Sequence, residues 1–229
     1  DKPDLPPSEG YTPEALADDV LALMDHVGFE RAVVAAHDLG ATVAQALARR
    51  APDRVAALAL FNPPYPGIGM RRFEPAAQAE LWYQHLHAQP WADRLIGYEL
   101  GTVDLYVRGM YEHWVGRHER LREAELEWIV QFYARPGAIR GSLAYYRARA
   151  GARLAEAAVE PAAWRVTQPT AVLWGEADPV MRVEWSDRLA EFFPNLLSLT
   201  TLPGVGHFVP FEAPVEATTA IRQAIRAAG

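Results

Sequence analysis

One short segment of the chain places an acidic side chain inside a tight turn. In Ala36–Ala41 (AHDLGA), an apolar run leads into a turn flanked by small residues, and a helical pattern begins directly behind it. This order is typical of a nucleophile elbow, a strained strand-turn-helix that exposes one side chain at the carboxyl end of a strand. That side chain is Asp38, and the dipole of the following helix favours its charged form. Asp38 can equally be a simple helix N-cap, and the segment alone leaves both interpretations open.

Two later segments carry the residue types that would complete a catalytic triad. Trp174–Pro179 (WGEADP) follows an apolar run and offers Asp178, an acid that can orient a histidine. The alternative for Asp178 is a solvent-exposed turn, because Asp-Pro is a common turn dipeptide. Pro203–Phe208 (PGVGHF) follows the last apolar run, and its glycines allow His207 to approach other backbone closely. On its own, a single histidine is more often structural than catalytic.

The three segments point to catalysis more strongly together than apart. They run in the order nucleophile, acid, histidine, and each follows a predicted strand of one parallel sheet. All three side chains are therefore expected at one edge of that sheet, with Asp38 in the place of the nucleophile and with Asp178 and His207 as the acid and the histidine. The remaining histidines stand in no comparable setting and are predicted to be structural: His26, His37, His85, His87, His113 and His118.

Alternating helices and strands must position these segments. A helix is predicted to start at Thr12, followed by Pro13 and Glu14, and to end at Gly28. Around the elbow we expect a strand at Ala32–Ala36, a helix at Ala41–Arg50 and a strand at Val55–Phe61. Near the C-terminus we expect a strand at Thr170–Trp174, a helix at Val183–Phe192, a strand at Leu197–Leu202 and a helix at Val215–Ala227. The short, continuous apolar runs predict an α/β fold whose mostly parallel sheet is buried on both faces by helices.

The middle of the chain differs from both ends. From about Phe73 to Trp164 the sequence is rich in Trp, Tyr, Arg, Glu and Ala, with helical periodicity and no convincing strand. Its clearest predicted helix is Leu121–Tyr133. We therefore expect residues 1–72 to form the first part of the core, 73–164 a helical lid inserted into it, and 165–229 the second part. The Pro-rich start, Asp1–Tyr11, is predicted to be loop.

Composition excludes several classes of function. The 229 residues suit one domain of ordinary size or one large domain with an insertion, and 50% of them are hydrophobic. A net charge of −7 argues against a nucleic-acid binder, and the absence of cysteine excludes disulfides, thiolate zinc sites and a cysteine nucleophile. No apolar stretch approaches the roughly 20 residues of a membrane helix, and no secretory pattern is present, so we expect a cytoplasmic protein without a membrane partner.

These motifs resemble the α/β-hydrolase family and, within it, the bacterial soluble epoxide hydrolases. The resemblance includes the elbow, the acid loop and the histidine loop, together with two lid segments, Leu81–His87 (LWYQHLH) and Arg140–Arg147 (RGSLAYYR). It implies an α/β-hydrolase fold in which Tyr83 and Tyr146 donate hydrogen bonds to the epoxide oxygen. Without it, tyrosines at these positions are more often lid packing. A shift of one residue, to Tyr145, stays open.

The resemblance also implies a mechanism. Asp38 would attack an epoxide carbon to give an ester, and His207, oriented by Asp178, would activate the water that hydrolyses this ester to a vicinal diol. The backbone amide of Leu39 would be one donor of the oxyanion hole. The expected partner is a small-molecule epoxide held by Trp82, Tyr145 and Phe208, with no metal, no other cofactor and no nucleic acid; a homodimer is left open.

The same resemblance leaves a gap and two rivals. Family members carry an upstream portion with a His-Gly-x-Pro turn, the second oxyanion donor, and Asp1–Pro3 looks like the loop that follows it. A sheet lacking those strands is expected to fold poorly alone. One rival is a dehalogenase, although Leu39 stands where haloalkane dehalogenases carry Trp, the elbow helix has no arginine before Arg49, and Tyr83-Gln84 replaces the His-Trp of fluoroacetate dehalogenases. The other rival is a non-catalytic binding module. A serine esterase is excluded because position 38 is Asp.

Overall fold

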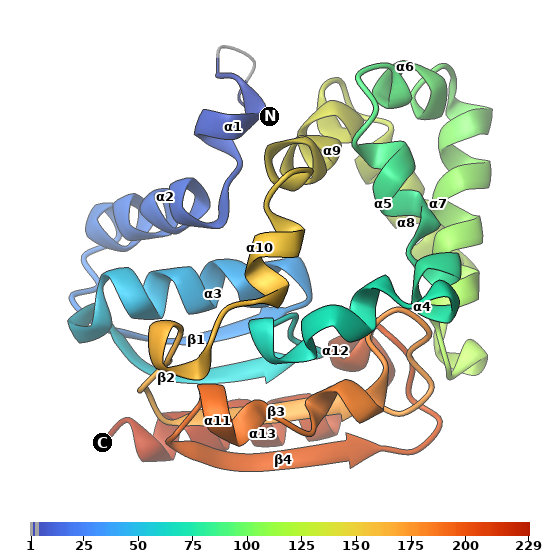
Figure 1. The fold of residues 1–229 in the computed structure, drawn as a ribbon. Coiled ribbons are helices and arrows are strands. Elements are labelled where there is room, and N and C mark those ends of the chain that lie inside the picture. Colours follow the sequence, from blue (N-terminus) through green and yellow to red (C-terminus); the bar gives the residue numbers. More distant parts are fainter. Residues whose placement is uncertain (1, 3–4) are drawn as a thin grey trace.

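A single parallel sheet organises the chain in the computed structural model, which describes residues 2 and 5–229. The strands are β1 (Ala32–His37), β2 (Val55–Phe61), β3 (Thr170–Gly175) and β4 (Leu196–Leu202). They pair in the order β1-β2-β3-β4, every pair parallel, so spatial order equals chain order. All carboxyl ends therefore lie at one edge of the sheet (Figure 1). The parallel sheet and the positions of its four strands confirm the prediction.

Helices connect the strands and build the region beside them (Figure 1). The helices of the core are α1 (Pro7–Gly10), α2 (Pro13–His26), α3 (Leu39–Arg50), α11 (Leu189–Phe192), α12 (Val209–Glu212) and α13 (Pro214–Ala227). Those of the middle segment are α4 (Pro75–Glu80), α5 (Trp82–His87), α6 (Ala92–Ile96), α7 (Leu100–Trp114), α8 (Glu123–Tyr133), α9 (Ala138–Arg149) and α10 (Arg153–Ala157). No helix of the described residues is long and apolar enough to cross a membrane.

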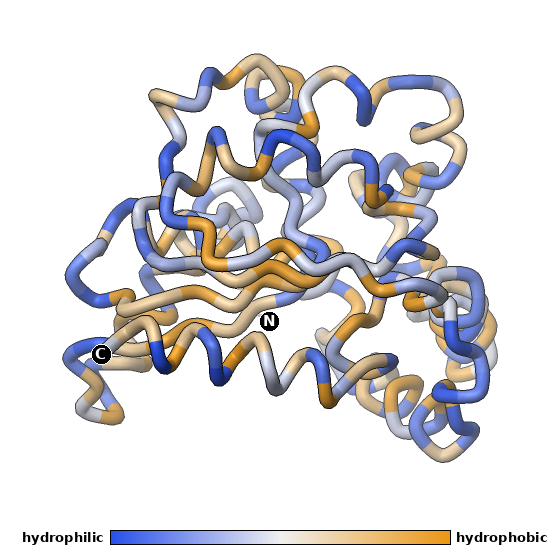
Figure 2. Tube along the Cα trace, turned by 90° about the horizontal axis from the view of Figure 1, so that it is seen from below, coloured by the Kyte–Doolittle hydropathy of each residue, from blue (hydrophilic) through white to orange (hydrophobic). Residues whose placement is uncertain are grey.

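Alternate side chains of the strands enter two hydrophobic cores, one on each face of the sheet. Leu58 and Leu60 pack with α3 and α11 on one face, whereas Ala57 and Ala59 pack under α13 on the other. Strand side chains alternate between faces, so a strand covered on both sides must be apolar throughout. All seven residues of β2 are buried. Figure 2 accordingly shows the sheet as a continuous hydrophobic band in the middle of the trace.

Strand β1 is less buried than its apolar sequence predicted. Every residue of β1 is partly or fully exposed, although the run was expected to be covered on both faces. The reason is its place in the sheet, because among the described residues β1 pairs only with β2. The apolar sequence indicates that the strand is suited to burial. How much of its surface is covered in this chain depends on its position at the edge of the sheet.

Two predicted elements are corrected. The expected helix at Val183–Phe192 is a 3-10 turn at Val183–Ser186 followed by the short α11. The two pieces are separated at Arg188, whose φ of −100° and ψ of 9° lie outside the helical region, and the Tyr65 hydroxyl donates to the carbonyl oxygen of Trp185, 2.7 Å away, just before this break. The N-terminal stretch, predicted as loop, contains the single turn α1, in which Pro7 occupies the first helical position. Residues 1, 3 and 4 of that predicted loop lie outside the described residues.

The middle segment is helical and has a core of its own. The described residues 73–164 contain α4–α10 and no strand. Apolar side chains of α6–α9, among them Val103, Val130 and Leu143, form a third hydrophobic cluster separate from the two against the sheet. Most of these helices gather beside the carboxyl ends of the strands (Figure 1). The predicted helix at Leu121–Tyr133 begins two residues later, at Glu123.

Candidate active site

Asp38 lies in a sharp turn between β1 and α3. Its φ of 44° and ψ of −118° are unusual for a residue with a side chain. The Asp38 amide donates to the carbonyl of Phe61 on the neighbouring strand, and the Asp38 carbonyl accepts from Ala41 at 2.9 Å. The carboxylate makes no capping hydrogen bond to the helix behind it, and the side chain is 24% exposed. The turn thus presents the carboxylate outward, and the N-cap alternative loses its defining contact.

His207 and Asp178 lie beside this carboxylate. Nε2 of His207 is 3.9 Å from Oδ2 of Asp38, and Nδ1 of the same ring is 2.7 Å from Oδ2 of Asp178. Asp178 is 4% exposed, which excludes the solvent-exposed turn considered from sequence. The three predicted residues therefore form one contiguous line, carboxylate, imidazole, carboxylate, assembled from the ends of β1, β3 and β4.

A fourth residue, Asn62, fixes Asp178 from the end of β2. The side-chain amide of Asn62 donates to Oδ2 of Asp178, and its own oxygen accepts from the backbone amide of Gly175 at 2.9 Å. The other carboxylate oxygen of Asp178 accepts from the amides of Val180 and Met181, at 2.8 and 2.9 Å. Every acceptor direction of Asp178 is thus occupied by a donor, so its orientation toward His207 is fixed.

The two carboxylates set the protonation of His207. Burial alone would lower the pKa of His207, but the charge and hydrogen bond of Asp178, together with the charge of Asp38, raise it to about 9. The ring is therefore an imidazolium near neutral pH while both carboxylates are charged. Removing the charge of Asp38 removes one of the causes that raise this pKa.

Three glycines bring the histidine loop against two other segments. A Cβ on Gly175 would lie 2.1 Å from the carbonyl oxygen of Gly206, and a Cβ on Gly206 would lie 2.3 Å from the amide nitrogen of Gly116. Both distances are shorter than any real Cβ contact, so only glycine fits there. The His207 amide also donates to the carbonyl of Trp114, the last residue of α7, at 2.9 Å. Backbone atoms are therefore in direct contact, with no side chain between them, where three segments meet. These segments are the end of β3, the loop that carries His207 and the end of α7.

A buried carboxylate ties the same loops together. Glu212, fully buried at the end of α12, accepts hydrogen bonds from the amides of Gly116, Arg117 and Gly206 at 2.8–2.9 Å and from Phe208 at 3.0 Å. Four donors around one carboxylate compensate its burial without a cation. Neither this role nor that of Asn62 was predicted, because each depends on residues far away in the sequence.

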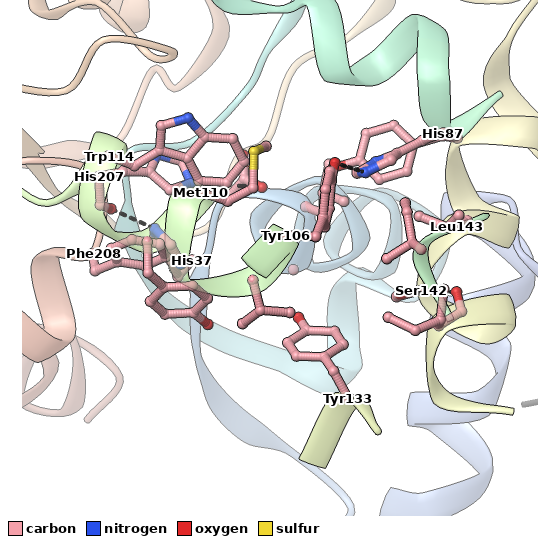
Figure 3. Close-up of a pocket in the computed structure, with 18 residues that line it drawn as sticks. His37, His87, Tyr106, Met110, Trp114, Tyr133, Ser142, Leu143, His207 and Phe208 are labelled. Carbon is pink, nitrogen blue, oxygen red and sulfur yellow. Dashed lines mark hydrogen bonds and ion pairs between the residues drawn. The ribbon is translucent and has the colours of Figure 1, made fainter. Parts of the chain in front are cut away.

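A cavity of about 290 Å³ opens in front of Asp38 (Figure 3). Its core side is formed by residues next to the strand ends, and its other wall by residues of helices α5–α9. The residues of the core side are His37, Asp38, Leu39, Gly40, His207 and Phe208. Leu39 is the first residue of α3, directly beside the carboxylate. The face of the cavity is mostly apolar, with Trp114 and Phe208 next to His207 (Figure 3).

The two tyrosines expected from the lid lie together in the structure. Tyr83 and Tyr146 are 5% and 8% exposed, and their ring centroids are 5.9 Å apart. Tyr146 lines the cavity, while Tyr83 packs against Trp114 of its wall with centroids 4.8 Å apart. Burial, together with the negative charge of Asp38, raises the pKa of both phenols well above the ordinary value. Both are therefore neutral and keep a hydrogen to donate.

The hydroxyl of Tyr83 is held by a chain of two side chains. The side-chain amide of Gln84 donates to this oxygen over 3.2 Å, and the guanidinium of Arg153 donates to the amide oxygen of Gln84. Because Arg153 can only donate, it fixes which end of the amide faces Tyr83. The Tyr83 oxygen thus accepts from Gln84, which leaves its own hydrogen for another partner.

The three predicted substrate-binding residues lie in different places. Phe208 lines the cavity and stacks on Tyr111, with centroids 4.3 Å apart and planes 6° from parallel. Trp82 is 49% exposed and lines a separate hollow between α5 and α7. Tyr145 is buried beside Tyr146, with the guanidinium of Arg149 over its ring. The structure thus places one of the three at the cavity in front of Asp38.

Two histidines predicted to be structural line the same cavity. Nε2 of His37 is 2.7 Å from the carbonyl oxygen of His207, and burial together with the charge of His207 lowers the pKa of His37 to about 4. His37 is therefore neutral and holds the histidine loop through an N–H donor. His37 could have been singled out from the sequence because it stands directly before Asp38, whereas nothing in the sequence pointed to His87.

Among the described residues, no group of His, Asp and Glu side chains is arranged to hold a metal ion.

Comparison with known proteins agrees with this architecture. Residues 2–214 match the family described as "alpha/beta hydrolase fold". The chain belongs to this family. Within it, the chain is 24% identical over 211 residues to epoxide hydrolase 4 of Homo sapiens, covering 90% of this chain and 56% of that protein. The chain thus spans about half the length of the first of these relatives.

Bacterial relatives of the alpha/beta hydrolase family match at slightly higher identity. Epoxide hydrolase A of Mycobacterium tuberculosis is 29% identical over 242 residues, which cover 93% of this chain and 74% of the relative. A fluoroacetate dehalogenase of Burkholderia sp is 28% identical over 233 residues, covering 95% of this chain and 71% of that protein. Overall identity to the two relatives, which differ in name, is therefore nearly the same.

Proposed function

We propose that this alpha/beta hydrolase opens epoxides with water to give vicinal diols, through an ester on Asp38. The observation that carries the proposal is that one cavity brings together a carboxylate with its histidine and a pair of neutral phenols. Asp38 and His207 lie on the core side, and the neutral phenol of Tyr146 lines the lid side, with the ring of Tyr83 packed against it at a centroid distance of 5.9 Å. A carboxylate can attack a strained sp³ carbon, and two phenols can donate to the oxygen that leaves it.

In the first step, an Asp38 carboxylate oxygen forms a bond to one epoxide carbon while the bond from that carbon to the ring oxygen breaks. The ring oxygen becomes an alkoxide that accepts hydrogen bonds from Tyr83 and Tyr146 and takes a proton from one of them. The product is a hydroxyalkyl ester of Asp38. The fixed amide of Gln84 supports this step, because it occupies the Tyr83 oxygen and leaves the phenol hydrogen for the substrate.

In the second step, His207 removes a proton from water, and the hydroxide formed adds to the ester carbonyl of Asp38. The oxyanion is stabilised by backbone donors, of which the Leu39 amide is one. Collapse of this intermediate breaks the bond between the acyl carbon and the alkyl oxygen. That oxygen leaves with the substrate and takes the proton of the newly formed carboxylic acid, so the diol is released and Asp38 is again a carboxylate. His207 had passed its earlier proton through solvent to the tyrosine that gave one up, when ester formation lowered the pKa of the ring, so the proton taken from water restores the resting imidazolium.

The charge on Asp38 can order the two steps. While Asp38 is ionised, its charge helps to raise the pKa of His207 to about 9, so the ring is protonated. Ester formation neutralises Asp38 and lowers the pKa of His207, which makes the ring a base when a base is needed.

Halide removal is the second candidate, since Asp38, His207 and Asp178 would also serve a dehalogenase. The residues around Asp38 favour the epoxide. Leu39 offers no N–H to a halide from its side chain, and α3 carries no arginine before Arg49 to hold a substrate carboxylate. A binding module without catalysis is the remaining alternative, and Asp38→Ala separates it, because binding would persist while turnover stops.

The test is the intact mass of the purified His207→Gln variant after incubation with styrene oxide. The ester should form and persist, so the protein should gain the whole mass of the epoxide, and the adduct should be absent when Asp38 is also changed to Ala. Absence of any adduct, with halide release from a fluoroacetate or chloroalkane substrate by the unmodified protein, would overturn the epoxide assignment.

A further inference from the structure

A second polar position lies in the cavity wall, on the lid side away from Asp38. It consists of His87, the last residue of α5, and Tyr106 in α7, whose hydroxyl oxygen is 2.6 Å from Nε2 of His87 (Figure 3). Both residues line the cavity. Apolar side chains such as Ile96 and Leu143 surround them, and the nearby hydroxyl of Ser142 is already donated to a backbone carbonyl at 2.9 Å.

His87 and Tyr106 together carry two polar hydrogens, one more than the hydrogen bond between them can use. Burial, helped by the charges of Arg153 and Arg147, lowers the pKa of His87 to about 4, so the ring is neutral and carries a single N–H. Burial raises the pKa of Tyr106, so the phenol keeps its O–H. Two hydrogens are therefore present, and only one can lie between Nε2 and the hydroxyl oxygen.

The surroundings of His87 indicate which hydrogen is left over. Nδ1 of His87 is buried and has no hydrogen-bond partner among the described residues. A buried N–H without an acceptor is rarer than a buried lone pair without a donor. The ring hydrogen therefore belongs on Nε2, where it is donated to the Tyr106 oxygen. The phenol hydrogen of Tyr106 is then free, and Tyr106 is a half-buried residue of the cavity wall.

We propose that Tyr106, positioned by His87, donates a hydrogen bond to a second oxygen of the substrate, away from the reacting ring. This inference rests on the proposed function and narrows its substrate class to epoxides that also carry an ether, carbonyl or hydroxyl oxygen. The subsite adjoins the reaction centre, because the ring of His87 lies 4.5 Å from that of Tyr146 and 5.3 Å from that of Tyr83. The second oxygen is therefore expected only a few bonds from the epoxide carbons.

Pairs of isosteric terminal epoxides test this subsite. Each pair consists of a 1,2-epoxyalkane and the same chain with one CH2 replaced by an ether oxygen, placed at successive positions from the ring. One neutral hydrogen bond should make the protein prefer the ether in one position by on the order of three- to tenfold in kcat/KM. Tyr106→Phe should abolish that preference, measured as the ratio of the two kcat/KM values within the pair. His87→Phe should reduce it in the same direction.

The matched control is Tyr133→Phe, since Tyr133 is another tyrosine of the same cavity wall and is not bonded to His87. This variant should retain the preference. A preference that survives in Tyr106→Phe, or that is lost equally in Tyr133→Phe, overturns the proposal, as does a wild-type protein that prefers no ether position.

Binding measurements separate this proposal from the proposed function. The diols corresponding to each pair are unreactive, and their binding can be followed by tryptophan fluorescence because Trp114 lines the cavity. A lower Kd for one ether diol in the wild type, lost in Tyr106→Phe, supports the subsite even when no epoxide is hydrolysed. Equal Kd values within every pair overturn the subsite even when epoxides are hydrolysed.

Discussion

Changing Asp178 to Asn should separate the two half-reactions of the proposed mechanism. One Asp178 oxygen accepts from the amides of Val180 and Met181, so the asparagine oxygen must stay there. Its NH2 group then replaces the oxygen that faces Nδ1 of His207 and the side-chain amide of Asn62. The N–H at Nδ1 of His207 and the side-chain amide of Asn62 would then both point at this NH2 group, which is itself a hydrogen-bond donor. His207 can avoid this conflict only by carrying its hydrogen on Nε2, and in that form it cannot take a proton from water.

The size of the effect follows from the contacts that are lost. The productive form of the ring gives up a hydrogen bond to a charged acceptor and places an N–H against an N–H, which together cost roughly 3–5 kcal/mol. Hydrolysis of the ester should therefore slow by about 10²–10⁴. Attack by Asp38 needs no base, so ester formation should remain within about tenfold of the wild type.

Rapid mixing with styrene oxide, acid quenching and intact-mass analysis would follow the esterified fraction over time. Asp178→Asn should reach nearly complete esterification and turn over slowly afterwards. Asp187→Asn is the matched control, because it removes the same charge from an exposed aspartate that pairs with Arg71. An Asp178→Asn protein that folds like the control and hydrolyses the ester at the wild-type rate would refute the proposed role of Asp178 in orienting His207. Equal loss of ester formation and ester hydrolysis would refute it as well.

Two further predictions concern the groups around the reacting atoms. Arg153→Met should slow ester formation by roughly tenfold and leave ester hydrolysis unchanged, because the chain that frees the Tyr83 hydrogen loses its anchor; equal slowing of both steps in single-turnover experiments would contradict this. Asp38→Asn should lower the pKa of His207 from its resting value of about 9, because a negative charge that raises it is gone. NMR titration of the imidazole measures the shift directly, and an unchanged pKa would show that Asp38 does not control the ring.

The sequence predicted best what is encoded locally. Each of the elbow, acid and histidine segments combines a strand end with small or turn-forming residues, and parallel strands place such ends at one edge. For this reason, the sequence alone was enough to predict that Asp38, Asp178 and His207 lie close together. Helix α2 was predicted for the same reason, since Thr12 caps it through its own side chain, 3.2 Å from the amide of Ala15.

Contacts between distant segments could not be predicted in this way. Asn62 resembles an ordinary strand stop, and its partner Asp178 lies 116 residues away. His87 is one of several histidines in a helical stretch, and only the packing of α5 against α7 gives it Tyr106. The predicted helix at Val183–Phe192 is instead broken at Arg188, next to a hydrogen bond that Trp185 accepts from Tyr65, 120 residues away in the sequence.

The close backbone contacts among Gly116, Gly206 and Gly175 limit how the middle segment can change. Gly116 belongs to the middle segment, yet it lies against Gly206, which in turn lies against Gly175 at the end of β3. Any side chain at position 116 would push on the loop that carries His207. A chimera that exchanges residues 73–164 for the matching segment of a relative must therefore keep a glycine there. Otherwise the exchange will damage a histidine about ninety positions further along the chain, in a part that the design never touched.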